Sequence, residues 1–125
     1  MVSSLTLTLS LPSGVLSPNW RGHWGKKSRA VKAARTEAHL EALNVLHELR
    51  VIKPLWAQAQ VQAVFHFRDV RRRDRDNLLA MLKPTFDGIA DAGIVGNDAG
   101  MIHMPVQVGM DKHRPRLVIT IAETA

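Results

Sequence analysis

The spacing of the hydrophobic residues limits the fold most strongly, because its period changes along the chain. Two segments alternate hydrophobic and polar residues, which is typical of a half-buried β-strand. In the first, residues 5–11, leucines occupy every second position. In the second, residues 58–67, one face carries Ala59, Val61, Ala63, Phe65 and Phe67. The sequence therefore predicts two strands, each with one buried face.

Elsewhere the hydrophobic residues recur every three or four positions, which indicates helices. From about Lys27 to Arg50 the predicted apolar stripe is Val31, Ala34, Ala38, Ala42, Val45 and Leu49. A second helix is predicted from Asp76 to Gly93, with a stripe of Leu79, Leu82, Phe86 and Ala90 and with Leu78 and Ile89 beside it. Pro84 disfavours one continuous helix. Either the helix kinks there, or Pro84 opens a fresh helix after a short helical turn.

The end of the chain predicts two closing strands, in residues 101–110 and 116–123, after a loop at 92–100. The predicted order is therefore β-α-β-α-β-β. A length of 125 residues, 46% hydrophobic content and the absence of repeats favour one domain, residues 1–125, with one core. We expect an α+β fold in which a mixed sheet carries two helices on one face.

The charge of the chain favours a polyanionic partner, with nucleic acid first. Seventeen Lys and Arg residues face eleven Asp and Glu, which gives a net charge of +6. Several of these cations gather before and within the first turns of the first helix, where the helix dipole alone would favour acids. The predicted DNA-binding residues of this region are Asn19, Arg21, Lys26, Lys27, Arg29 and Lys32. Asn19 either anchors its loop or contacts phosphate.

Other features exclude whole classes of site. Without cysteine, the chain has no disulfide, zinc–thiolate site or cysteine nucleophile, and it fits a reducing compartment. No apolar run approaches the roughly 20 residues of a membrane span. The first residues alternate and lack a basic region, unlike a signal peptide. We therefore expect a cytosolic protein with no membrane partner.

The segment VRRRDRDN, residues 70–77, places two aspartates among four arginines. If the chain is helical from Asp76 onward, Lys83 and Asp87 lie within about 20° of Asp76 around the helix axis, with Ala80 between them. Asp74 precedes the helix. Asp98 lies in the loop after it, and a compact topology would return Asp98 toward Asp74 and Asp76.

Such a group suits a divalent metal, because Mg²⁺ takes one or two protein carboxylates and completes its shell with water and phosphate. Lys83 would hold the scissile phosphate or the leaving oxygen. Neighbouring phosphates would be neutralised by Arg71, Arg72, Arg73 and Arg75. In the alternative, Asp76 only caps the helix, and Asp74 pairs with Arg72 or Arg73.

These motifs together resemble one family. The pattern RRRDRDN, a following lysine, FDGIADAGIV and a later aspartate, preceded by LSPNWRGHW and a basic helix, is similar to the RusA family of Holliday junction resolvases. The resemblance implies a homodimer that uses Mg²⁺ or Mn²⁺ to cut two opposed strands of a four-way DNA junction. It places the paired acids at Asp74 and Asp76, the lysine at Lys83 and the later acid at Asp98. It also implies the cytoplasm of a bacterial cell or of a phage-infected host.

The sequence departs from the family pattern at two places. Many members carry two adjacent acids after the helix, whereas here the first of them is Asn97. The spacing from Asp76 to Lys83 is also longer than in the best-known member, although it stays near a whole number of helical turns. Three residues are expected to support the metal ligands without being ligands: Asn77, Asp87 and Asn97.

The sequence leaves three functions open. The first is a metal-dependent endodeoxyribonuclease that resolves four-way junctions in recombination and repair. The second is a module of the same fold that binds branched DNA without cutting it, an alternative favoured by the loss of an acid at Asn97. The third and weakest is a metal-dependent RNase or general nuclease.

Overall fold

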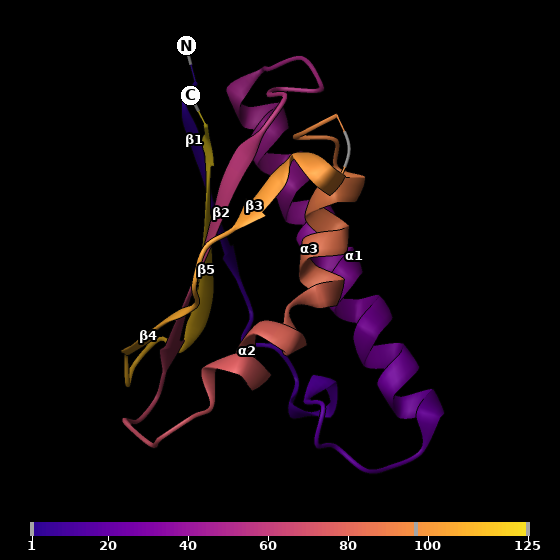
Figure 1. Ribbon diagram of the computed structural model, residues 1–125, viewed down its shortest axis with the longest axis vertical. Coiled ribbons are helices and arrows are strands. Elements are labelled where there is room, and N and C mark those ends of the chain that lie inside the picture. Colours follow the sequence, from indigo (N-terminus) through magenta and orange to yellow (C-terminus); the bar gives the residue numbers. More distant parts are fainter. Residues whose placement is uncertain (1, 97, 125) are drawn as a thin grey trace.

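The fold of this chain is known from a computed structural model, which describes residues 2–96 and 98–124, and for Asp98 the backbone alone. Within these residues, one mixed five-stranded sheet carries helices α1 and α3 on one face (Figure 1). The elements are β1 (Ser4–Leu9), η1 (Gly14–Leu16), α1 (Trp24–Leu49), β2 (Ala59–Phe67), α2 (Arg75–Met81), α3 (Lys83–Asp91), η2 (Asp98–Gly100), β3 (Met101–His103), β4 (Gln107–Met110) and β5 (Arg116–Glu123). The predicted α+β class, the mixed sheet and the single small domain are confirmed.

Strand β2 organises the sheet. It runs antiparallel to β5, which in turn pairs with β1, and its other edge is shared by β3 and β4 in parallel. β3 lies beside the start of β2, where Met101 faces Ala59, and β4 lies beside its end, where Met110 faces Phe67. The prediction of one strand over residues 101–110 was therefore wrong. Pro105 stands between the two strands, and a proline has no N–H to donate to the ladder.

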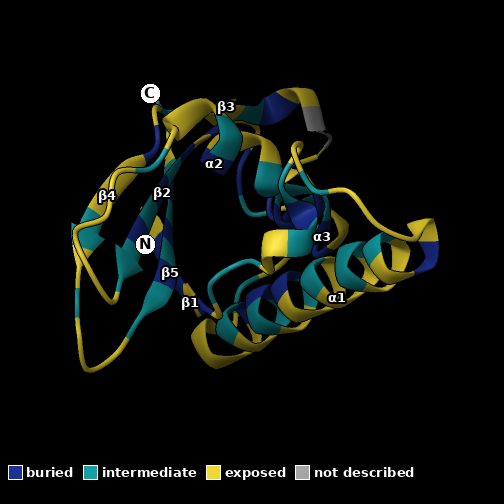
Figure 2. Cartoon of the chain, turned by 90° about the horizontal axis from the view of Figure 1, so that it is seen from below, coloured by how far each residue is buried: buried dark blue, intermediate teal, exposed yellow. Residues whose placement is uncertain are grey.

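The predicted alternation is confirmed by the burial of the strands. Leu5, Leu7 and Leu9 of β1 are buried, as are Ala59, Val61, Ala63 and Phe65 of β2. Together with Leu117, Ile119 and Ile121 of β5, they form the sheet side of the core. Figure 2 shows the buried residues concentrated between the sheet and the helices. The helix-facing side of the sheet is thus the hydrophobic side.

Helix α1 begins three residues before its predicted start. His23 caps it, because its Nδ1 accepts a hydrogen bond from the Gly25 amide at 3.1 Å. The buried side chains toward its end are Ala38, Ala42 and Leu46, whereas Leu49, predicted in the stripe, is 43% exposed. Leu49 keeps the helix period, since it lies within about 20° of Ala38 around the axis. It is the last residue of α1, so its exposure reflects the end of the helix.

The second predicted helix is two helices. α2 ends at Met81, and α3 restarts at Lys83 with Pro84 in its first turn. Of the two alternatives, the fresh helix opened by Pro84 is therefore correct. The buried face consists of Leu78, Leu82, Pro84, Thr85, Gly88 and Ile89. The predicted stripe of Leu79, Phe86 and Ala90 is less buried, and these three residues line a hollow.

Candidate metal and nucleic-acid site

The arginine-rich segment, residues 70–77, follows the end of strand β2. The guanidinium of Arg73 lies over the ring of Phe67, at 3.7 Å from its centroid, and bonds the Asp69 carboxylate at 2.9 Å. The Arg71 amide and then the Arg73 guanidinium hold the pKa of Asp69 below its ordinary value. The alternative in which Arg73 pairs with Asp74 is therefore wrong. The partner is Asp69, a residue that the sequence analysis did not single out.

Asp74 caps helix α2. Its Oδ1 accepts hydrogen bonds from the Asp76 amide at 2.8 Å and from the Asn77 amide at 3.3 Å. The capping role that the alternative interpretation gave to Asp76 thus belongs to Asp74. Among the described residues, no hydrogen bond or ion pair reaches the second oxygen of Asp74 or the carboxylate of Asp76. Both side chains are exposed.

This donor set fits a magnesium ion held by two carboxylates. Asp74 and Asp76 offer free oxygens, and water and substrate phosphate would complete the coordination. In the described part of the chain, no three histidine, aspartate or glutamate side chains form a group that could hold a metal. A site built on described residues would therefore use two protein ligands.

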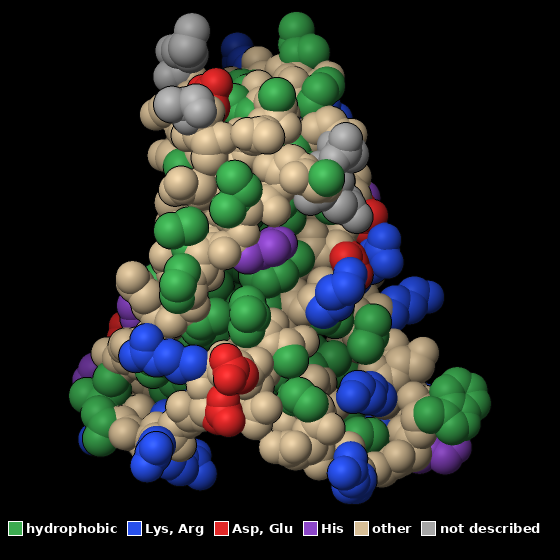
Figure 3. Space-filling model, viewed as in Figure 1, with side chains coloured by type: hydrophobic (Ala, Val, Ile, Leu, Met, Phe, Trp, Pro, Cys, Tyr) green, Lys and Arg blue, Asp and Glu red, His purple; other side chains and the backbone are tan. Residues whose placement is uncertain are grey.

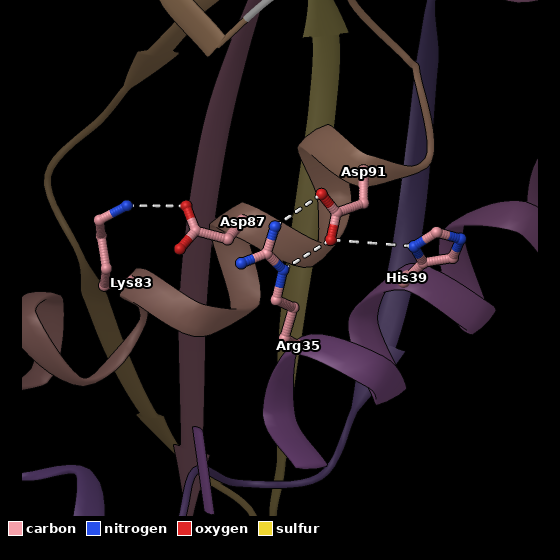
Figure 4. A network of polar contacts seen from close by, with 5 residues as sticks. All are labelled: Arg35, His39, Lys83, Asp87 and Asp91. Atoms are coloured by element: carbon pink, nitrogen blue, oxygen red, sulfur yellow. Dashed lines mark hydrogen bonds and ion pairs between the residues drawn. The ribbon is translucent and has the colours of Figure 1, made fainter. Parts of the chain in front are cut away.

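Lys83 lies beside Asp87. The Lys83 ammonium is 2.7 Å from Asp87 Oδ1, one turn along α3, and the lysine side chain is 77% exposed (Figure 4). Ala80, Lys83 and Asp87 line one hollow, so this part of the predicted row is confirmed despite the helix break. Asp76 does not line the hollow, and the prediction of one straight helix carrying both Asp76 and Lys83 was wrong, because α2 ends at Met81 and α3 begins at Lys83.

The hollow lies between α2, α3 and β3 and has a volume of about 380 Å³. Its walls are mostly apolar, and the rings of Phe86 and His103 meet there with centroids 4.1 Å apart. Figure 3 shows hydrophobic side chains exposed in the middle of this face. No sequence pattern singled out His103 as a site residue. Its place in the hollow depends on the pairing of β3 with β2, which no local pattern reveals.

The ring of His103 is expected to stay neutral at pH 7. Partial burial, and after it the Lys83 ammonium, lower the pKa of His103 below the ordinary value of 6.5. A titration followed by the NMR signals of the ring should therefore give a midpoint below that of a histidine in an unfolded peptide. Replacing Lys83 by methionine should raise the midpoint. A wild-type midpoint at or above the peptide value would contradict this description of the hollow.

Asp98 and Asn97 were expected near Asp74 and Asp76. The backbone of Asp98 opens η2 directly before β3, which pairs with the start of β2, whereas the arginine segment follows the end of β2. Helix α3, nine residues and about 13 Å long, lies between α2 and this loop (Figure 1). The structure therefore does not bring the backbone of Asp98 to Asp74. The Asp98 side chain and Asn97 lie outside the described residues.

The basic residues gather at one end of the molecule. In Figure 1 the segment before α2 and the first turn of α1 lie at the same end, and Figure 3 shows lysine and arginine side chains there around an acidic group. Arg75 is partly engaged, because its Nη1 lies 3.4 Å from the Val106 carbonyl oxygen. The exposed predicted DNA-binding residues are Asn19, Arg21, Lys26, Arg29, Lys32, Arg71, Arg72 and Arg75, whereas Lys27 and Arg73 are half-buried.

A second polar cluster joins helices α1 and α3. Arg35 of α1 donates to both oxygens of Asp91 in α3, at 2.6 and 2.8 Å, and His39 lies 3.9 Å from Asp91 Oδ2 (Figure 4). The hydrogen bonds from Arg35 lower the pKa of Asp91 below its ordinary value. The position of this cluster between α1 and α3 indicates a structural role.

Asparagine at position 91 is expected to lower the free energy of unfolding by about 1 kcal/mol at pH 7, a modest loss because the side chains are partly exposed. The folded carboxylate has the lower pKa, so its contribution is full above the ordinary value of 3.8 and is lost as the pH falls through the folded value. Urea unfolding of the wild type and of Asp91→Asn, at neutral and at strongly acidic pH, measures this contribution to the free energy of unfolding. A difference that persists in acid would contradict it.

The fold and the site together define a small α+β protein with an acid pair set in a basic surface. Within the described residues, no helix has the length and apolar character needed to cross a membrane. No known protein-family model matches the chain. An uncharacterized protein of Xylella fastidiosa (strain Temecula1 / ATCC 700964) is 38% identical over 117 residues, which are 93% of this chain and 74% of that protein. The chain belongs to the same family as this Xylella protein.

Proposed function

We propose that the protein is a metal-dependent endodeoxyribonuclease that resolves four-way DNA junctions, as the resemblance to the RusA family implies. One observation carries the proposal. The exposed Asp74 and Asp76, with carboxylate oxygens free among the described residues, open α2 directly after the arginine segment. Phosphate attracted by the arginines would therefore meet a carboxylate pair suited to Mg²⁺ or Mn²⁺.

Each side chain has a part in this proposal. Asp74 and Asp76 hold the metal, which when bound would activate water and stabilise charge on the phosphoryl oxygens. Arg71 and Arg72, exposed on the same segment, bind the flanking phosphates. Lys83 would exchange its contact with Asp87 for the scissile phosphate or the leaving oxygen.

The proposed assembly is a homodimer. A junction has opposed strands related by a two-fold axis, and a symmetric dimer would present one site to each of them. The basic first turns of α1 would bind the arms of the junction. We place such a protein in the cytoplasm of a bacterium or of a phage-infected cell. Asp98 is a third ligand of the proposal only if its side chain reaches α2 from the far end of α3.

A second candidate is a branched-DNA-binding protein without nuclease activity. It is favoured by Asn97, which stands where many members of the resembling family have an acid. This candidate keeps the basic surface and predicts tight binding of junctions without cleavage in either metal.

A panel of substrates separates these functions. The purified protein would be incubated with a labelled four-way junction, a linear duplex of the same sequence and a single-stranded RNA, in Mg²⁺ and in Mn²⁺. Paired cuts near the branch point, with linear duplex and RNA intact, are the expected result. Binding without any cut would favour the second candidate, and equal cleavage of all three substrates would indicate a general nuclease.

A further inference from the structure

The hollow between α2, α3 and β3 has apolar and aromatic walls, and of its lining the proposed chemistry uses Lys83 and its partner Asp87 alone. We propose that it holds one unstacked base of the DNA strand bound at Asp74 and Asp76, an inference that rests on the proposed function. Ala80 of its wall lies one helical turn after Asp76 on α2. A base in the hollow would thus belong to a nucleotide next to the metal site.

The walls of the hollow suit a flat, neutral and largely apolar group. Phe86 and His103 present aromatic rings, and Leu79, Ala90 and Met101 add apolar surface. Bases stack on aromatic side chains in proteins that bind single strands. The lowered pKa of His103 keeps that ring uncharged near neutral pH, so a base could cover it without burying a charge. The volume of about 380 Å³ lies in the range of small-ligand pockets.

The rim of the hollow carries the polar groups that a nucleotide needs. Lys83 Nζ offers a positive charge for the phosphate, and Asp87 offers an acceptor for an N–H donor of the base, such as the N3–H of thymine. A phosphate inside the apolar part would lose its hydration without a partner, so the base enters and the phosphate stays at the rim. The basic surface at the end of the molecule where α2 and α1 begin favours a nucleic-acid strand over a neutral partner.

The base is expected to be an unpaired one. A base inside a duplex is covered by its neighbours, and it must leave the stack before an aromatic wall can contact it. The branch point of a junction supplies bases that leave the stack at low cost. The hollow would then help the protein to prefer branched over linear DNA through a contact that no linear duplex offers.

The test uses the whole protein and two short ligands without metal. NMR signals of the Met101 methyl group and of the His103 ring would be followed during titration with the trinucleotide d(TTT). An abasic trinucleotide with the same phosphates is the matched ligand. We expect saturable shifts of both signals with d(TTT) and none with the abasic ligand. Equal shifts with both ligands, or shifts confined to the arginine segment, would overturn the proposal.

Variants test the aromatic wall separately. Two variants, Phe86→Leu and His103→Ala, each remove one aromatic ring from the wall. Each is expected to weaken d(TTT) binding about tenfold. His103→Phe, which keeps an aromatic ring, should bind like the wild type. Unchanged binding by His103→Ala would contradict a stacking role. Signals that shift with protein concentration alone would assign the hollow to a second copy of the chain and overturn the base site.

This titration distinguishes the failure of the inference from the failure of the proposed function. Cleavage of a junction without any d(TTT) shift at Met101 would leave the nuclease standing and remove the base site. Specific d(TTT) shifts in a protein that never cuts a junction would support the base site and remove the nuclease.

Discussion

Junction cleavage by an Asp76→Asn variant is expected to fall by about a hundredfold or more, because the proposed metal loses one of two carboxylate ligands. Among the described residues, none makes a hydrogen bond or ion pair with the exposed Asp76 carboxylate, so the folded state should be almost unaffected. The free energy of unfolding should change by no more than about 0.5 kcal/mol. Initial cleavage rates in Mg²⁺, together with urea unfolding of both proteins, measure the two effects.

Asp111→Asn is the control for the loss of a negative charge in this region, although Asp111, unlike Asp76, pairs with Arg116 at 2.8 Å and its own stability must be measured. Asp111 lies at the same end of β2 as the arginine segment, since its amide donates to the Phe67 carbonyl oxygen. The substitution removes the same charge in the same region but touches no proposed ligand. It should leave the cleavage rate within about threefold of the wild-type rate, because an exposed charge outside the site contributes little energy. Equal rates for the wild type and Asp76→Asn would refute the assignment of Asp76.

Valine at position 88 is expected to destabilise the protein by about 3 kcal/mol. Gly88 is buried where α3 meets α1, and a Cβ there would overlap the backbone carbonyl oxygen of Arg35 and press on the Ala38 side chain. A backbone carbonyl cannot move aside as a flexible side chain can, so the two helices must separate. Chemical denaturation, with the midpoint and slope both fitted, measures the loss.

Gly14→Val provides the comparison for this prediction. A Cβ at Gly14 would meet no atom within 4 Å, so the same substitution there has room. Its effect on the free energy of unfolding should stay near 0.5 kcal/mol, as for most exposed positions. If Gly88→Val proved as stable as Gly14→Val, the close contact between α1 and α3 would be wrong.

Strands β1 and β2 and the first helix could be predicted because their cause is local, whereas the division of residues 101–110 into β3 and β4 was missed. The alternation of Leu5, Leu7 and Leu9, and of Ala59 to Phe65, reflects one buried face of a sheet. The break at Leu82 was predictable as one of two outcomes, since Pro84 fits the first turn of a helix but not its interior. Phe86 and Ala90 line the hollow instead of the core. Which face of α3 packs on the core depends on tertiary contacts, so no local pattern predicts it.

The site was predictable in part for the same reason. Residue types and spacing singled out Asp74, Asp76 and Lys83. They did not reveal that Arg73 pairs with Asp69, that Asp74 caps α2, or that the rings of His103 and Phe86 are in contact. Each of these contacts depends on side-chain geometry, or on strand pairing between distant segments. The position of the Asp98 backbone beyond α3 likewise follows from the parallel pairing of β2 and β3.

Paramagnetic broadening by Mn²⁺ tests the central claim, that Asp74 and Asp76 together hold a divalent metal. With substoichiometric Mn²⁺, the amide signals of residues 74–77 should broaden first, and Mg²⁺ in excess should restore them. Broadening that also reaches residues 99–101 would add Asp98 to the site. An Asp74→Asn, Asp76→Asn double variant should keep its signals sharp. Signals of residues 74–77 that stay sharp in the wild type, or broaden equally in the double variant, would contradict the claim.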